Sequence, residues 1–290
     1  MTTANDQYYV PDGSQWPIIA VAGIFLTVLG IALWVNAIGA GPIITGLGLL
    51  IVCYLFFGWF GDVIDESLSG NYNTQVDHSF RQGMIWFIAS EAFFFASFFG
   101  ALYYLRTIAV PWLDGQGHLG SSHMLWDNFV AAWPLISTPD PEKYVQVKEA
   151  MGAGGIPLIN TVILLSSGAT LTWAHWGLKK DSKNQLVLGL ILTVVLGAIF
   201  MGFQAYEYVH AYSELGLTLN SGVYGSTFYM LTGFHGMHVT IGTLMLIVIT
   251  VRSIKNHFSH EKHFAFEAVA WYWHFVDVVW LGLYIFVYWL

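Results

Sequence analysis

The chain has 290 residues, of which 56% are hydrophobic and only 10% are Asp, Glu, Lys or Arg, and its formal net charge is -8. Ordinary soluble domains carry about 25% charged residues, so this composition excludes a water-soluble domain and predicts an integral membrane protein. The few Lys and Arg residues are scattered along the chain, which excludes nucleic acid as a partner because its phosphates require clustered cations.

The first apolar region covers residues 13–61, which contain no Asp, Glu, Lys, Arg or His. It is about twice as long as one helix needs to cross the hydrocarbon core of a bilayer. The sequence Gly-Ala-Gly-Pro at 39–42 interrupts it with residues that favour a turn. We therefore expect a hairpin of two helices at about residues 16–38 and 43–60.

Five further apolar stretches follow along the chain. They are continuous and do not alternate with polar residues, so their backbone groups must be satisfied inside helices and not in a β-barrel. With the hairpin, they predict an all-α integral membrane protein with seven transmembrane helices. The five stretches cover residues 82–105, 156–178, 186–208, 225–251 and 264–289.

The connection over residues 106–155 is long, acidic and contains several Pro residues. We interpret it as an external loop with one short helix near residues 141–151. Basic residues favour the inner side of a membrane, and most of them lie in the connections on the same side as the N-terminus. This bias predicts an N-terminus inside and a C-terminus outside. Arg81, Lys179, Lys180, Lys183, Arg252, Lys255 and Lys262 lie on the inner side, against Arg106, Lys143 and Lys148 on the outer side.

Glu91 is an ionisable residue at membrane depth. It lies ten residues beyond Arg81, which places it about 15 Å along a helix and near the middle of the bilayer. Ionisable groups are costly there, so each one is paired within the protein or functional. Glu91 therefore has two interpretations, a carboxyl group that binds or relays protons or a neutral acid that is hydrogen-bonded to a neighbouring helix.

The last expected helix contains Glu267, His274 and Asp277, which fall within about 80° of one another around its axis. This polar face must turn toward other helices. The preceding helix carries His235 and His238 in the sequence FHGMH. Haem ligation by His235, His238 or His274 is one interpretation, and a hydrogen-bonded His in the core is the commoner alternative.

Glu207 and His210 have the ExxH spacing that is found in di-iron helix bundles. Such a site needs a second ExxH and two further Glu residues on facing helices, and the sequence lacks the second copy. We therefore expect no metal in this chain, and we assign these two residues to a structural polar network together with the polar residues of the last two helices.

The remaining basic and thiol side chains exclude further classes of protein. The Lys residues lie in loops or at the ends of spans, so none is buried as a retinal Schiff base requires. Cys53 is the only Cys, which excludes an internal disulfide and a thiolate metal cluster. Arg252 and Lys255, at the inner end of their helix, suit an anionic lipid headgroup or only follow the positive-inside bias.

Four segments carry a family resemblance. The sequence is FYMLTGFHGMHVTIGTLMLIV at residues 228–248 and HFAFEAVAWYWHFVDVVWLGLYIFVYWL at residues 263–290, and RQGMIWFIASEAFFFASFF at 81–99 and PLINTVILLSSGATLTWAHWGL at 157–178 agree with the same pattern. These segments resemble cytochrome c oxidase subunit III. The resemblance covers nearly the whole chain except its start and the connection at 106–155.

The resemblance implies an accessory subunit of a proton-pumping oxidase that reduces oxygen to water. The subunit would have no catalytic residue and no cofactor of its own, with haem and copper in the partner subunits. Subunit I would be its main contact, subunit II a further partner, and cytochrome c the electron donor to the complex, because the related quinol oxidase subunit typically lacks the first two helices. It would support proton uptake and protect the enzyme from inactivation during turnover.

The resemblance also implies a division of the chain. Residues 1–60 would form the N-terminal segment and a two-helix hairpin, and residues 61–290 a five-helix bundle, with bound phospholipids in a V-shaped cleft between them. The longer connection at 106–155 suggests a bacterial inner membrane, or the mitochondrial inner membrane if the source is eukaryotic. The alternative is a free-standing transporter or proton channel that uses Glu91, His274 and Asp277.

Individual residues carry over from the family pattern. Glu91 matches a midmembrane Glu, and Arg252 with Lys255 matches a basic pair near a bound lipid. The family commonly has WWRDVIRES where this chain has WFGDVIDES at residues 59–67, so Gly61 and Asp65 replace two Arg residues. The residues of this segment that remain as lipid-binding candidates are Trp59, Asp62 and Glu66.

Overall fold

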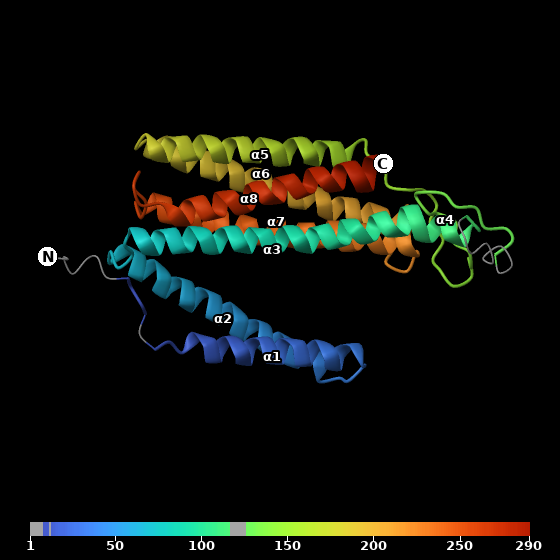
Figure 1. Cartoon of the computed structure of the whole chain (residues 1–290), viewed down its shortest axis with the longest axis horizontal. Coiled ribbons are helices and arrows are strands. Elements are labelled where there is room, and N and C mark those ends of the chain that lie inside the picture. Colours follow the sequence, from blue (N-terminus) through green and yellow to red (C-terminus); the bar gives the residue numbers. More distant parts are fainter. Residues whose placement is uncertain (1–7, 12, 117–125) are drawn as a thin grey trace. The chain divides into compact units, whose positions relative to one another are not determined.

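The computed structural model describes residues 8–11, 13–116 and 126–290. The expectations for residues 1–7, 12 and 117–125 lie outside the described residues. Within the described ranges the regular elements are helices and no strand occurs (Figure 1). Seven helical segments are long and apolar enough to cross a membrane, which confirms the prediction of an all-α protein with seven spans.

The chain divides into two compact units, Met1–Gln82 and Gly83–Leu290. The first unit contains helices α1 (Trp16–Val35) and α2 (Gly41–Leu68) and the first turns of α3 (Thr74–Tyr104). The grouping into residues 1–60 and 61–290 and the expected lipid cleft stay predictions.

Helices α1 and α2 form a tight hairpin because small residues let their backbones approach closely. A Cβ atom at Gly30 would overlap the backbone of Thr45, and one at Gly48 would overlap the backbone of Thr27. Each helix has a Pro in its first turn, where the missing N–H donor has no intrahelical partner to lose. The turn occupies residues 36–40, next to the break that the sequence predicts at 39–42, and Gly41 and Pro42 already belong to α2.

The second unit contains the rest of α3 and a bundle in which α5, α6, α7 and α8 lie side by side (Figure 1). Gly155 and Gly222 precede α5 and α7 with φ values of 72° and 86°, which residues with a Cβ atom rarely adopt. The helices are η1 (Leu105–Ala109), α4 (Val110–Leu113), α5 (Ile156–Lys179), α6 (Lys183–Ser213), α7 (Val223–Ile254), α8 (Phe264–Leu283) and η3 (Tyr284–Trp289).

Two Trp residues of α8 form the centre of the bundle. Trp273 and Trp280 are fully buried, and each indole N–H donates a 2.9 Å hydrogen bond to α5, Trp273 to Ser167 Oγ and Trp280 to Thr161 Oγ1. Because a buried indole N–H without an acceptor is costly, these two bonds fix how α8 faces α5.

The expected short helix near residues 141–151 is wrong. This described segment consists of turns and irregular backbone. Two of its N–H groups bond to a distant connection: Val145 N donates to Asn220 O at 3.1 Å and Lys148 N to Leu215 O at 2.9 Å. Tertiary hydrogen bonds therefore replace the helical ones.

Candidate functional site

Glu91 of α3 contacts His238 of α7. Glu91 Oε2 lies 3.0 Å from His238 Nε2, and the two side chains are 23% and 7% exposed. The rings of Phe95 and Tyr272 lie next to the imidazole, with centroids 5.0 and 6.2 Å away. The expected midmembrane carboxyl group is therefore paired between helices and surrounded by aromatic rings.

Both ring nitrogens of His238 lie within hydrogen-bond distance of an oxygen atom. Its Nδ1 lies 2.7 Å from the carbonyl oxygen of Phe234, so Nδ1 carries a hydrogen and donates it. A single further proton between Nε2 and Glu91 Oε2 then completes the contact, as a carboxylic acid beside a neutral imidazole or as an ion pair. Glu91 and His238 are thus joined by one hydrogen bond between α3 and α7.

The polar face of α8 lies against α5. His274 Nδ1 is 3.5 Å from Asp277 Oδ2, and His274 Nε2 is 3.5 Å from Thr172 Oγ1 of α5. Asp277 is 6% exposed, and its Oδ2 lies where a Cβ of Gly168 would be. A glycine on α5 therefore makes room for a buried carboxyl group on α8.

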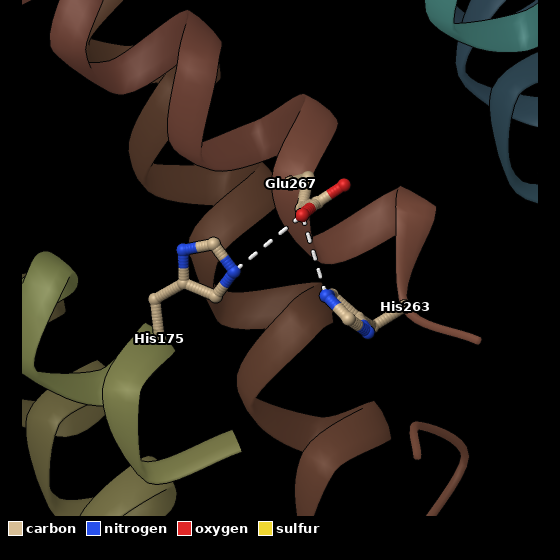
Figure 2. A group of neighbouring side chains, drawn as sticks. All are labelled: His175, His263 and Glu267. Atoms are coloured by element: carbon tan, nitrogen blue, oxygen red, sulfur yellow. Dashed lines mark ion pairs between the residues drawn. The ribbon is translucent and has the colours of Figure 1, made fainter. Parts of the chain in front are cut away.

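Glu267 belongs to the same face but has different neighbours. It lies in the first turn of α8, and its Oε1 is 3.3 Å from Nε2 of His263 and 3.6 Å from Nε2 of His175 (Figure 2). His263 caps the N-terminus of α8, whereas His175 is in the last turns of α5. This group joins the ends of two helices that are far apart in the sequence.

Glu207 and His210 of α6 do not share a site. Glu207 is 1% exposed and accepts a 2.6 Å hydrogen bond from the hydroxyl of Tyr288. Among the described residues, the ligand atoms of three His or carboxylate side chains come within 4.8 Å of one another only at His175, His263 and Glu267. Within the ExxH sequence at residues 207–210, Glu207 therefore forms a buried hydrogen bond and His210 lies outside this cluster.

His235 is fully buried. Its Nε2–H donates to the carbonyl oxygen of Val276 at 3.2 Å. The rings of Trp280 and Phe200 flank the imidazole, with centroids 5.0 and 5.7 Å away. These contacts connect α6, α7 and α8 through one side chain.

Arg252 and Lys255 lie at the C-terminal end of α7 with different environments. Arg252 is only 8% exposed, and its guanidinium carbon lies 4.6 Å from the centre of the Phe258 ring. Lys255 is exposed at the helix C-cap. Lys183 donates to the carbonyl oxygen of Ile254 at 2.9 Å, so three cationic side chains gather at this end of the second unit.

Trp59, Asp62 and Glu66 line a cavity of about 340 Å³ in the first unit, together with residues 13–16. Asp62 Oδ2 accepts a 2.7 Å hydrogen bond from the indole of Trp16. Glu66 accepts hydrogen bonds from two tyrosine hydroxyls, Tyr72 at 2.6 Å and Tyr9 at 3.1 Å. The cavity therefore brings the three residues together with a polar wall.

The Tyr72 hydroxyl lies in the short connection between α2 and α3, outside the helical spans. Burial raises the pKa of this phenol above its ordinary value, and the hydrogen bond to Glu66 raises the pKa further because a negative carboxylate disfavours the phenolate. Tyr72 therefore remains a hydrogen-bond donor to Glu66 well into the alkaline range.

The sequence prediction missed His175 and His263, which contact Glu267. One signal was present, because His263 and Glu267 are four residues apart and therefore on one face of a helix. His175 had no such local signal, since only the packing of α5 against α8 brings it to the other two.

Comparison with known proteins places the chain in a family. It matches the model described as "Cytochrome c oxidase subunit III" over residues 6–116 and 143–290. "Cytochrome c oxidase subunit 3" of Lycodon semicarinatus is 40% identical over 100% of this chain and 99% of its own length. The proteins of the same name from Formosania lacustris and Latimeria chalumnae are 40% and 41% identical, and each alignment covers 97% of this chain and 96% of the relative.

Proposed function

This chain belongs to the cytochrome c oxidase subunit III family, which makes it a multi-pass membrane protein of an oxidase complex, and we propose that it acts there as an accessory subunit without a redox centre of its own. Haem and copper would lie in partner subunits, with subunit I as the main contact, subunit II as a further partner and cytochrome c as the donor. The alternative of a free-standing transporter or proton channel is not favoured by the family match over residues 6–116 and 143–290.

The observation that carries this proposal is the pairing of the ionisable side chains inside the second unit. Glu91 contacts His238, Glu207 contacts Tyr288 and Asp277 contacts His274. Paired groups stabilise helix packing in the membrane. Each of these pairs joins side chains of this chain, which fits a supporting role beside a catalytic partner better than direct redox chemistry.

We further propose that phospholipids bind at two places. The first is the basic end of α7, where Arg252 and Lys255 suit an anionic headgroup. The second is the cavity lined by Trp59, Asp62 and Glu66, where the acidic side chains favour a headgroup that carries an ammonium group. Bound lipid would support proton uptake by the partner and protect the complex during turnover.

We propose the bacterial inner membrane as the location, with the N-terminus in the cytoplasm and the C-terminus in the periplasm. The distribution of Lys and Arg among the connections supports this orientation. The family match omits residues 117–142, which belong to the long connection, and this extra length is the basis for the bacterial assignment.

Removal of this subunit from the purified complex tests the proposed function. We expect the initial rate of oxygen reduction to remain largely intact, because the redox centres are in other chains, and we expect the activity to be lost faster over repeated turnovers. Re-adding the subunit should restore the lifetime. If the initial rate disappeared, or if the subunit alone moved protons across a liposome membrane, the accessory role would be wrong.

The basic lipid site has its own prediction. Replacing both Arg252 and Lys255 with Ala should lower the amount of anionic phospholipid that co-purifies with the complex and shorten its lifetime during turnover, because two cationic contacts are worth about 2 kcal/mol at a membrane surface. Native mass spectrometry measures the lipid directly. Lys262→Ala, which removes a basic residue from the following connection, is the control, and equal lipid content in all three proteins would contradict the site.

A further inference from the structure

The cluster of His175, His263 and Glu267 has the composition of a metal site. The ligand atoms of the three side chains lie within 4.8 Å of one another, and Figure 2 shows both imidazole rings turned toward one carboxylate. We propose that these residues bind a divalent cation of the zinc class between the end of α5 and the start of α8. This inference is independent of the accessory role proposed above.

The distances agree with tetrahedral coordination. Zinc lies about 2.0–2.2 Å from His nitrogen and carboxylate oxygen atoms, so two ligands of one tetrahedron are about 3.3–3.6 Å apart. Glu267 Oε1 is 3.3 Å from His263 Nε2 and 3.6 Å from His175 Nε2. Neither contact meets the geometry of a hydrogen bond, since both nitrogens lack a hydrogen-bond partner among the described residues. A cation between the three atoms accounts for both observations.

The hydrogen bond of His263 Nδ1 leaves its Nε2 available to a metal. His263 Nδ1 lies 3.0 Å from the carbonyl oxygen of Ser259 and donates its hydrogen there. In a neutral imidazole, this leaves Nε2 with a free lone pair directed toward Glu267. A backbone carbonyl that accepts the other N–H is the usual support of a metal-binding His, because it fixes the tautomer and the ring orientation.

The ligand types select the class of cation. Two imidazoles and one carboxylate suit zinc and similar transition metals, whereas Ca²⁺ and Mg²⁺ prefer oxygen ligands only. The site is partly accessible to solvent, because the side chains of His263, Glu267 and His175 are 8%, 13% and 22% exposed. Three protein ligands with partial exposure leave the fourth position to water, as in zinc sites that exchange their metal.

A bound cation would join α5 and α8, which are separated in the sequence by α6 and α7. His175 is in the last turns of α5, and His263 and Glu267 are at the first turn of α8. The metal would also neutralise the carboxylate of Glu267 close to the basic connections. Zinc therefore is expected to stiffen this end of the bundle and to change its charge when it binds.

Zinc titration of the intact complex tests the site. The complex is stripped with a chelator and titrated with Zn²⁺, and the retained metal is measured by mass spectrometry. We expect wild type to retain one more zinc per complex than His263→Gln or Glu267→Gln, or to bind it about tenfold or more tightly. His260→Gln is the matched control, because His260 lies in the same connection but is 56% exposed and pairs with the exposed side chains of Asp181 and Glu261. Equal zinc binding in wild type and His263→Gln, or loss of binding in His260→Gln, would overturn the proposal.

A second measurement requires no variant and therefore decides the matter even if the substitutions prevent assembly. Diethyl pyrocarbonate modifies imidazole nitrogens that are not bonded to a metal. Zinc added to the wild-type complex should lower the modification of His175 and His263 severalfold and leave that of His260 unchanged, whereas Mg²⁺ should protect none of them. If zinc protects all three His residues equally, or none of them, the cluster does not bind zinc and the proposal is wrong.

Discussion

The α1–α2 hairpin and the bundle of α5 to α8 are held together by different means. In the most apolar windows of α1 and α2, 11% and 17% of the residues are buried within the chain, against 33% to 50% in the four bundle helices. The hairpin relies on glycines that bring two backbones together, and its apolar side chains face outward. The bundle buries Trp rings and hydrogen-bonded polar pairs.

This difference follows from the physics of the bilayer. Lipid is as apolar as Leu, so burial of apolar side chains alone does not drive two helices together, and close backbone contact or interhelical hydrogen bonds must do so. Residues 13–61 contain no Asp, Glu, Lys, Arg or His, and their two helices use close backbone contact. The bundle uses interhelical hydrogen bonds, which give its polar residues specific partners.

The largest expected effect is at a glycine of the hairpin. Gly48→Leu places a side chain against the backbone of Thr27, which neither helix can avoid without separating. Overpacking of this kind costs about 1–3 kcal/mol or more. Thermal unfolding of the purified protein, followed by the loss of helical circular dichroism, reports this separation, and we expect a lower midpoint in the variant.

Gly46 provides the matched control for this test. It lies on the same helix, but a Cβ atom there would meet nothing within 4 Å. Gly46→Leu should therefore leave the midpoint of thermal unfolding unchanged. Equal effects of the two substitutions would show that close backbone contact does not hold the hairpin.

The bundle should respond to the loss of one buried hydroxyl group. Tyr288→Phe removes the 2.6 Å hydrogen bond to Glu207, which is 1% exposed. A buried acid without its donor costs about 1–3 kcal/mol, and thermal unfolding of the purified complex should show this as a lower temperature for release of the subunit. The control Tyr206→Phe removes a hydroxyl from a side chain that is 60% exposed, and its release temperature should match wild type; a similar drop in both variants would contradict the paired role.

Glu91→Gln separates stability from redox chemistry. A Gln amide can still bond to His238, so we expect a stability loss of about 1 kcal/mol at most and an initial rate of oxygen reduction close to wild type. The control His238→Gln changes the other partner of the same 3.0 Å contact and should behave alike. Loss of nearly all initial turnover in Glu91→Gln would mean that this carboxyl group takes part in the reaction.

The sequence predicted the helices well and their ends less well. Hydropathy marks the hydrocarbon core and not the end of a helix, so α2 continues from the expected residue 60 to Leu68 and α3 begins at Thr74 instead of residue 82. Asp62 and Glu66 lie on these added turns, where charged side chains meet water and do not stop a helix. The prediction of a short helix at residues 141–151 failed for another reason, because the hydrogen-bond partners of this segment are remote in sequence.

The candidate site was predictable only in part. Membrane depth and helix periodicity selected Glu91, Glu207 and Glu267 as residues that need partners. The identity of each partner depends on which helices are neighbours, and a single sequence does not contain that information. Packing of α3 on α7 pairs Glu91 with His238. Packing of η3 on α6 pairs Glu207 with Tyr288, and packing of α5 on α8 pairs Glu267 with His175.

A similarly small effect is expected at the end of the hairpin. Tyr72→Phe removes the hydrogen bond to Glu66 Oε2, which costs about 0.5–1.5 kcal/mol at neutral pH and should lower the midpoint of thermal unfolding. The pKa of Tyr72 is higher in the folded state than its ordinary value of about 10. Its stabilising contribution is therefore complete below the ordinary value and declines as the pH rises above it.

The difference between wild type and Tyr72→Phe should consequently be full at pH 8 and smaller at pH 11, when the midpoints of thermal unfolding of the two proteins are compared at each pH. Tyr54→Phe is the control, because Tyr54 is 59% exposed on α2 and should show the wild-type midpoint throughout. A difference that grows with pH would mean that the ionised phenol stabilises the hairpin, contrary to the direction that burial and the carboxylate of Glu66 impose.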